Sequence, residues 1–278
     1  MESRYVVKQY MSRGAQAETF DALDTESDVQ VILKLTHKAD LSVNQQNQLL
    51  REAQLQRKIS SEFVVKVLNA YETASDIVTV LEFAPFGDFE TQIQKRSAPF
   101  DESAIITWAM QLLLGLKHTH SHNIIHRDVK TANIVLIKDD KFPNAKAMLC
   151  DFGIATENDL AKTVVGTPYY MSPQACKGLN YGQKTDIWAL GVVLYRLCTF
   201  EYPFFAGNQI ALRARIASGV FQEVKGYSEE LTGLINRMLE QNEALRPEAE
   251  ELLKDPIFES RIRHFKYNEE ADTVEGTQ

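Results

Sequence analysis

Apolar residues in the first 83 positions of the chain occur mostly in short segments rich in β-branched residues. Their alternation with polar residues predicts strands over residues 5–11, 28–36, 63–72 and 77–83. One segment with helical periodicity, residues 44–59, lies between the second and third of these strands. The pattern therefore predicts a small sheet that carries one helix.

The pattern changes beyond residue 83. Pro85 and Gly87 interrupt the strand pattern, and segments with helical periodicity follow, among them residues 103–121. Residues 184–200 are apolar nearly all round, as expected of a helix at the centre of a helical lobe. We expect an α+β chain with a β-rich lobe over 1–83, a helical lobe over 84–266 and a solvated acidic tail over 267–278.

Composition and charge argue against several kinds of binding partner and indicate a cellular compartment. The chain has 278 residues and a net charge of −8 at pH 7, which argues against binding to the phosphate backbone of nucleic acid. Its three cysteines have no metal-ligand spacing and favour a reducing compartment, the cytosol or the nucleus. Glu2 and the absence of an apolar core near it argue against a signal peptide. The longest apolar run, residues 187–195, is about half the length that crosses a bilayer, so we expect no membrane association.

Two ordered motifs carry the candidate chemistry. The segment HRDVKTANIVL contains Asp128, Lys130 and Asn133, and a DFG segment that begins at Asp151 follows it. Any one of these residues alone could be a solvated side chain, but the ordered set is specific. Phosphoryl transfer needs a base that orients the attacking hydroxyl and hard oxygen ligands that hold Mg²⁺. The ordered set supplies both.

On these motifs the chain resembles the protein kinases over nearly its whole length. The resemblance implies their bilobal fold, with ATP and Mg²⁺ as cofactors. It implies that Asp128 accepts the substrate hydroxyl proton and that Lys130 lies beside the moving phosphoryl group. It also implies that Asn133 and Asp151 are the magnesium ligands.

The resemblance assigns an ATP site as well. Lys34 occupies the strand-lysine position and Glu52 that of its glutamate partner, and their ion pair would align the α- and β-phosphates. The segment TVLEFAPFGDF resembles the hinge, where Leu81 guards the back pocket and the backbone of Glu82 and Phe83 follows the adenine edge. The other predicted ATP contacts are the phosphate-covering loop residues Met11, Ser12, Gly14 and Ala17, and the residues around the adenine, Thr19, Ile32 and Val135.

Later segments refine the resemblance. GTPYYMSP resembles the substrate-positioning segment, and the DIW that begins at Asp186 resembles the helix start that braces the catalytic loop. Lys130 together with Thr167 is similar to Ser/Thr kinases and unlike tyrosine kinases, so the implied substrates are Ser or Thr hydroxyls of proteins. Within that group the chain looks most like the NIMA-related kinases, which implies cytoskeletal or cell-division work.

Several positions depart from the kinase pattern and keep a second hypothesis open, a nucleotide-binding scaffold with little activity. Ser12 and Ala17 replace two of the three glycines that let backbone amides approach phosphate. Gln56 stands at a usually apolar helix position, and Gln174 replaces the glutamate that would pair with Arg246, leaving at best a hydrogen bond to a neutral acceptor. A third hypothesis, a small-molecule kinase, is disfavoured by GTPYYMSP.

The resemblance also predicts regulation through an upstream kinase or an activating partner. Thr163 is the predicted activating phosphorylation site, because Arg127 beside the catalytic aspartate can bind a phosphate that orders the loop. Thr156 is the weaker candidate. Thr167 is expected to contact the catalytic residues through its hydroxyl.

Overall fold

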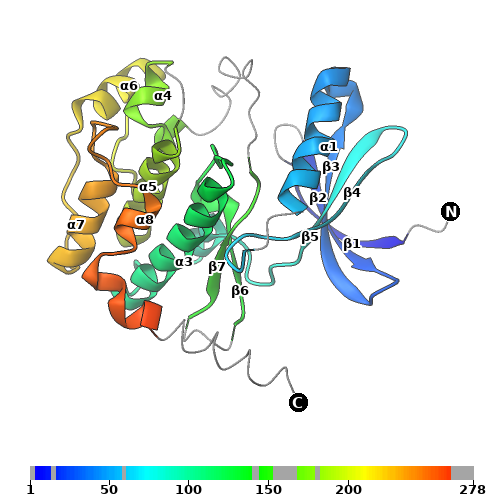
Figure 1. The fold of residues 1–278 in the computed structure, drawn as a ribbon, viewed down its shortest axis with the longest axis horizontal. Helices are drawn as coiled ribbons and strands as arrows, with labels where there is room; N and C mark the ends of the chain where they lie inside the picture. Colours follow the sequence, from blue (N-terminus) through cyan, green and yellow to red (C-terminus); the bar gives the residue numbers. More distant parts are fainter. Residues whose placement is uncertain are drawn as a thin grey trace. The chain divides into compact units, whose positions relative to one another are not determined.

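The computed structural model describes residues 4–13, 17–57, 61–139, 144–152, 168–178 and 182–263 (Figure 1). The chain divides into two compact units, unit 1 (Met1–Pro85) and unit 2 (Phe86–Gln278). The predicted tail over 267–278 lies outside the described residues. Among the helices that the structure describes, none combines the length and the apolar character needed to cross a membrane.

Unit 1 contains a five-stranded antiparallel sheet with the strand order β1-β2-β3-β5-β4. One face of the sheet buries the side chains of Tyr5, Ala22, Val31, Leu33, Val78 and Val80. Directly paired residues of antiparallel strands share a face, so the register makes this core continuous across β2, β3 and β5. The five strands are β1 (Tyr5–Arg13), β2 (Ala17–Asp24), β3 (Val29–His37), β4 (Val67–Glu72) and β5 (Asp76–Glu82).

The helix of unit 1 is α1 (Val43–Arg57), which follows the short 3-10 helix η1 (Lys38–Asp40). Ser42 and Gln45 cap its start. The Gln45 N–H donates to Oγ of Ser42 at 3.4 Å, and the Ser42 N–H donates to Oε1 of Gln45 at 2.9 Å, which is the reciprocal pattern of a capping box. α1 contacts β4 and β5 (Figure 1).

Unit 2 is mainly helical, with one two-stranded sheet. The α-helices of its described part are α2 (Phe89–Gln94), α3 (Glu102–Ser121), α4 (Pro173–Cys176), α5 (Lys184–Thr199), α6 (Gln209–Ser218), α7 (Glu229–Met238) and α8 (Ala249–Leu252). The antiparallel strands are β6 (Ile134–Ile137) and β7 (Lys146–Leu149). Short 3-10 helices are η2 (Thr131–Asn133), η5 (Pro168–Tyr170) and η6 (Pro256–Phe258).

α5 forms the core of unit 2. Every residue from Thr185 to Cys198 is buried, and the helix contacts both α3 and α7. It ends at Phe200, whose backbone is left-handed with φ of 62° and whose N–H donates to the Arg196 carbonyl at 2.8 Å. The prediction of an apolar helix at the centre of the helical part is confirmed.

Two strand predictions need correction. The apolar pattern does not predict β2, because its sequence AETFDALD is rich in Ala, Asp and Glu, which have low strand propensity. Pairing with β1 on one side and β3 on the other stabilises it instead. The strand predicted over 63–72 begins only at Val67, and residues 63–65 are buried ahead of it.

Candidate functional site

The three predicted catalytic residues lie together in the 126–133 loop, which precedes β6. Nζ of Lys130 donates to Oδ2 of Asp128 at 2.7 Å, and Nδ2 of Asn133 donates to the same oxygen at 2.8 Å. Nδ2 of Asn133 also donates to the Asp128 carbonyl at 2.9 Å. The Asp128 side chain is 44% exposed. Among the described residues its other oxygen, Oδ1, has no hydrogen-bond donor, so Oδ1 is open to a hydroxyl donor.

Asp186, near the start of α5, holds the backbone of this loop. Its buried carboxylate accepts the N–H of His126 at 2.9 Å and the N–H of Arg127 at 2.9 Å, and it contacts Nε2 of His120 at 2.8 Å. Arg127 has a φ of 66°, a conformation that a non-glycine residue keeps only when its surroundings hold it. The expectation that Asp186 braces this loop is confirmed.

His126 joins the loop to the segment after β7. Its ring is completely buried, Nε2 donates to the Cys150 carbonyl at 3.0 Å, and Nδ1 accepts the Asp128 N–H at 3.3 Å. Burial lowers the pKa of His126 and outweighs the nearby carboxylates of Asp186 and Asp128, which raise it. The ring packs against Phe152 with the centroids 4.4 Å apart. Neutral His126 therefore fits both of its hydrogen bonds.

The two predicted magnesium ligands lie at adjoining ends of the β6–β7 sheet. The Cys150 N–H donates to the Asn133 carbonyl at 2.9 Å, which brings the next residue, Asp151, close to Asn133. Both Nδ2 bonds of Asn133 go to Asp128, so its amide oxygen remains the atom available to a cation. An amide oxygen and a carboxylate are hard ligands of the kind that Mg²⁺ prefers. These residues fit a magnesium ion.

In unit 1, predicted ATP contacts gather on the sheet face opposite the core. The strand register pairs Ser12 with Thr19, Thr19 with Lys34, and Ile32 with Leu81. Paired residues share a face, and residues two apart on a strand do also. These five side chains therefore lie on one face, while the residues that alternate with Ile32 and Lys34 on β3 belong to the core.

The remaining predicted ATP contacts occupy several places. Ala17 begins β2, and Met11 lies on β1 with 48% of its surface exposed. The Glu82 N–H donates to the Lys66 carbonyl at 3.1 Å, and Phe83 follows the end of β5. Val135 is a half-buried residue of β6, in unit 2.

Several predicted residues cannot be placed. Gly14, Thr156, Thr163 and Thr167 lie outside the described residues. Glu52 belongs to α1, but its side chain is outside what the structure describes.

Arg246 and Gln174 meet as the sequence predicts. Arg246 donates to Oε1 of Gln174 at 3.0 Å, to the Glu240 carbonyl at 2.9 and 3.0 Å, and to the Lys184 carbonyl at 2.9 Å. Its guanidinium lies over the Trp188 ring, 5.0 Å from the centroid. The expected hydrogen bond to a neutral acceptor is confirmed.

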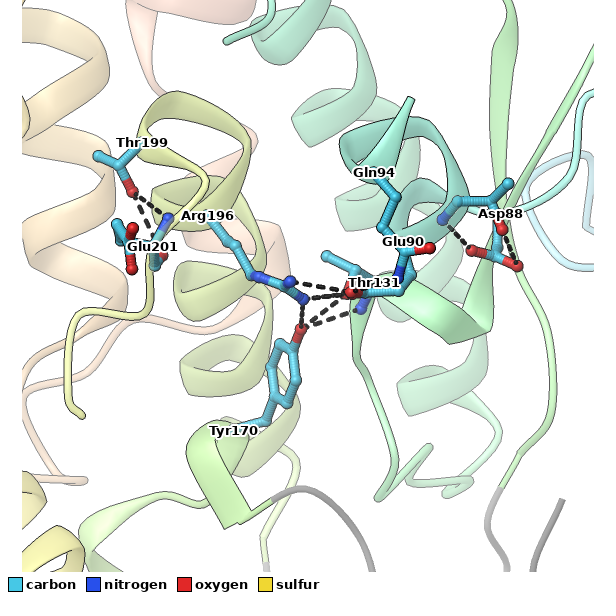
Figure 2. Close-up of polar contacts among 9 residues, drawn as sticks. Asp88, Glu90, Gln94, Thr131, Tyr170, Arg196, Thr199 and Glu201 are labelled. Atoms are coloured by element: carbon cyan, nitrogen blue, oxygen red, sulfur yellow. Dashed lines mark hydrogen bonds and ion pairs between the residues drawn. The ribbon is translucent and has the colours of Figure 1, made fainter. Parts of the chain in front are cut away.

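Unit 2 contains a second polar cluster, which the sequence pattern does not predict. It consists of Glu90, Thr131, Tyr170 and Arg196, which lie on α2, η2, η5 and α5 (Figure 2). Glu90 and Arg196 are 106 residues apart in the chain, so no local spacing indicates their contact. The available signal is Arg196 itself, a charged residue that follows an apolar run in a buried helix.

Comparison with known proteins identifies relatives of the whole described fold. The family described as protein kinase domain matches residues 5–258. The chain is 33% identical over 268 residues to serine/threonine-protein kinase Nek1 of Mus musculus, and 33% identical over 265 residues to Nek5 of Homo sapiens. It is 34% identical over 293 residues to the probable serine/threonine-protein kinase nek1 of Dictyostelium discoideum. The resemblance to the NIMA-related kinases is confirmed.

These alignments cover nearly all of this chain but only part of each relative. They include 94%, 93% and 97% of the chain, which spans 22%, 37% and 58% of the length of the three relatives, in the same order. Similarity alone therefore does not assign the activity of a whole relative to this chain. The match of the family over residues 5–258 shows that the chain belongs to the protein kinase family.

Proposed function

We propose that the chain transfers the γ-phosphate of ATP to Ser or Thr hydroxyls of protein substrates, in the presence of Mg²⁺. The observation that carries this proposal is the exposed Asp128 carboxylate, which Lys130 and Asn133 hold through one oxygen. The similar proteins are named serine/threonine-protein kinases, which favours protein phosphorylation over the scaffold and small-molecule hypotheses.

In the proposed reaction the substrate hydroxyl oxygen attacks the γ-phosphorus. The bond between that phosphorus and the bridging oxygen of ADP breaks, and the hydroxyl proton passes to Oδ1 of Asp128. Lys130 lies beside Asp128 and supplies positive charge near the transferred group. Asn133 and Asp151 would hold Mg²⁺, which would supply positive charge to neutralise the phosphates. Because such catalysis consists mostly of positioning and electrostatics, the fixed 126–133 loop is the main contribution of the chain.

A phosphate-transfer assay with Mg-ATP and a generic Ser/Thr substrate tests the proposal. Asp128→Asn should lower the rate about 100-fold or more, because it removes the proton acceptor. Asp28→Asn is a matched control. Asp28 is exposed in the turn after β2 and has a φ of 55°, which asparagine tolerates. Equal signals from wild type and Asp128→Asn would indicate a contaminant and favour the scaffold hypothesis.

We also propose that phosphorylation of Thr163 raises the activity, through an upstream kinase or an activating partner. The argument is the position of Arg127, whose backbone Asp186 fixes directly beside Asp128. A phosphate on Thr163 that pairs with this guanidinium would order the loop that carries Thr163 by charge-assisted hydrogen bonds. Mass spectrometry of active protein and assays of Thr163→Ala beside Thr156→Ala test this. Full activity of Thr163→Ala, with no phosphate at residue 163 in wild type, would contradict it.

We propose the cytosol or the nucleus as the location of the protein, with association with the cytoskeleton. Cys176 and Cys198 are free thiols, and burial raises the pKa of Cys198 to about 12. Free thiols support a reducing compartment. Microscopy of the tagged protein, with microtubule and DNA markers, tests the location.

A further inference from the structure

Glu90 and Arg196 form the charged part of the polar cluster in unit 2. The two guanidinium NH2 groups of Arg196 bind the two carboxylate oxygens of Glu90, one of them at 2.9 Å. The side chain of Arg196 is 9% exposed and that of Glu90 is 29% exposed. Burial raises the pKa of Glu90, but the hydrogen bonds from Arg196 and Thr131 outweigh it, so the pKa is lowered overall. The pair is therefore ionised and largely shielded from water.

Two hydroxyl groups connect this ion pair to neighbouring segments. Oγ1 of Thr131 donates to Glu90 at 2.6 Å and accepts from Arg196 at 2.9 Å. Oη of Tyr170 lies 2.8 Å from Oγ1 of Thr131 and accepts from Arg196 at 3.2 Å (Figure 2). Since the Thr131 proton goes to Glu90, the Tyr170 hydroxyl donates to Thr131. The ionised pair thus sets the direction of every hydrogen bond in the cluster.

Thr131 lies within the catalytic part of the 126–133 loop. It follows Lys130 directly, and it begins the 3-10 turn that ends at Asn133, whose N–H donates to the Lys130 carbonyl at 2.9 Å. Lys130 and Asn133 are the two side chains that hold Asp128. A shift of Thr131 would therefore displace both donors at the proposed base.

The helices α2, α5 and η5 hold Glu90, Arg196 and Tyr170 in place around Thr131. Glu90 lies in the first turn of α2, where Asp88 caps the helix by accepting the Thr91 N–H at 2.7 Å. Arg196 lies in the last turn of α5, the most buried helix of unit 2, and its guanidinium packs 4.3 Å from the centroid of the Tyr202 ring. Tyr170 belongs to η5, within the GTPYYMSP segment.

We propose that Glu90 and Arg196 are positioning residues for phosphoryl transfer, which hold the 126–133 loop and the Pro168–Met171 segment together through the hydroxyls of Thr131 and Tyr170. This inference rests on the proposed function. The ion pair acts through Thr131 on Lys130 and Asn133, and through Tyr170 on the segment that resembles the substrate-positioning element of the family.

Kinetic analysis of charge variants tests the proposal. Glu90→Gln and Arg196→Gln should each lower kcat about tenfold or more, because misplacement of catalytic groups is costly. The Kd for ATP measured without Mg²⁺ should stay within about twofold, since neither side chain is among the predicted nucleotide contacts. Thr131→Val and Tyr170→Phe, which remove one hydroxyl each without a change of charge, should lower kcat by a smaller factor of about three.

A charge swap distinguishes a loss of kcat caused by misplaced catalytic residues from one caused by a less stable fold. Thr and Tyr hydroxyls can donate and accept, so Glu90→Arg combined with Arg196→Glu can rebuild the ion pair with the hydroxyl protons directed to the new carboxylate. One wild-type hydrogen bond is lost, because Thr131 has a single hydroxyl proton. The swap should restore kcat to within about threefold of wild type. Lys117→Gln breaks the exposed ion pair with Glu250 and is the control, with unchanged kcat.

The outcomes are distinguishable. Unchanged kcat in both Glu90→Gln and Arg196→Gln would overturn the proposal, and so would a swap with kcat as low as that of the single variants. Melting curves show that each variant is folded at the assay temperature. Failure of the proposed function itself would appear separately, as equal rates for wild type and Asp128→Asn.

Discussion

Arg246 is completely buried, and within the described residues its guanidinium donates only to uncharged oxygens. Burial lowers the pKa of Arg246 to about 10, although the nearby Glu240 and Glu243 raise it. A buried cation is stabilised most by a carboxylate that accepts two of its hydrogen bonds. Among the described residues, Gln174 is the side chain that accepts a hydrogen bond from this guanidinium.

Gln174→Glu should therefore stabilise the protein, by about 1–2 kcal/mol, because a charged acceptor replaces a neutral one. The variant loses the hydrogen bond from Nε2 of Gln174 to the Gln241 carbonyl, which is the smaller contribution. Gln174→Met replaces the side chain by one of similar size that cannot accept this hydrogen bond. It should destabilise the protein by about 1–2 kcal/mol. Denaturant unfolding of the three proteins measures the order, and a glutamate variant less stable than wild type would contradict the argument.

His126 makes stability depend on pH in the acidic range. Its folded-state pKa lies below the ordinary value of 6.5, so below that pH the unfolded chain takes up a proton that the folded chain does not. The free energy of unfolding should fall as the pH decreases below about 6.5, by up to about 1.4 kcal/mol per pH unit for one proton. His126→Asn should show a smaller slope between about pH 6.5 and 5. An unchanged slope would mean that His126 takes up its proton as readily in the folded chain as in the unfolded chain.

The catalytic trio could be predicted from sequence because its members lie within six positions and their order is specific. The Glu90–Arg196 cluster could not be predicted in this way. Its contacts join residues that are 26 to 106 positions apart, and only the packing of α2 and η5 around α5 brings them together. Local spacing carries information about one loop but none about which distant helices meet.

At the scale of elements, α5 and α7 pack closely at a glycine. A Cβ at Gly191 would lie 2.8 Å from the Met238 Cβ and 3.1 Å from a methyl group of Leu239. Gly191→Ala should therefore destabilise the protein by about 1–3 kcal/mol through overpacking. Gly233, in α7, is the matched control, because a Cβ there meets nothing within 4 Å.

Gly233→Ala should stabilise the protein, by about 0.5–1 kcal/mol, because alanine loses less backbone entropy in a helix. Melting temperatures of the two variants should therefore move in opposite directions. A Gly191→Ala variant as stable as wild type would show that the two helices can separate at little cost.

Long elements with clear periodicity were the most predictable. Helices α3 and α5 appear where the apolar pattern places them, since burial of nearly every residue leaves a strong signal. β2 has half-buried positions at most of its length, and its pairing partners rather than its composition stabilise it. The apolar pattern of β2 is therefore too weak to predict a strand. Residues 63–65 show the opposite case, because they are buried and apolar but do not belong to a strand.

At the scale of the whole molecule, ligand binding should raise the stability of the folded chain. A nucleotide at about 100 times its Kd adds about 2.7 kcal/mol by mass action. Asp151→Ala should lose the magnesium-dependent part of this stabilisation, because it removes a proposed ligand. Asp128→Asn should keep it, because asparagine retains a side-chain oxygen that can accept the hydrogen bond from Nδ2 of Asn133. Thermal shifts measured with ATP, with and without Mg²⁺, separate the variants, and a full magnesium effect in Asp151→Ala would contradict the assignment.

The two amides that Asp186 binds have a consequence for hydrogen exchange. The N–H groups of His126 and Arg127 belong to a loop, yet both donate to a carboxylate that is 1% exposed. Deuterium can replace these protons only when α5 and the loop separate. They should therefore exchange as slowly as the amides of α5 itself, at the rate of global opening rather than of loop fluctuation. Their lifetimes would report how long unit 2 stays intact.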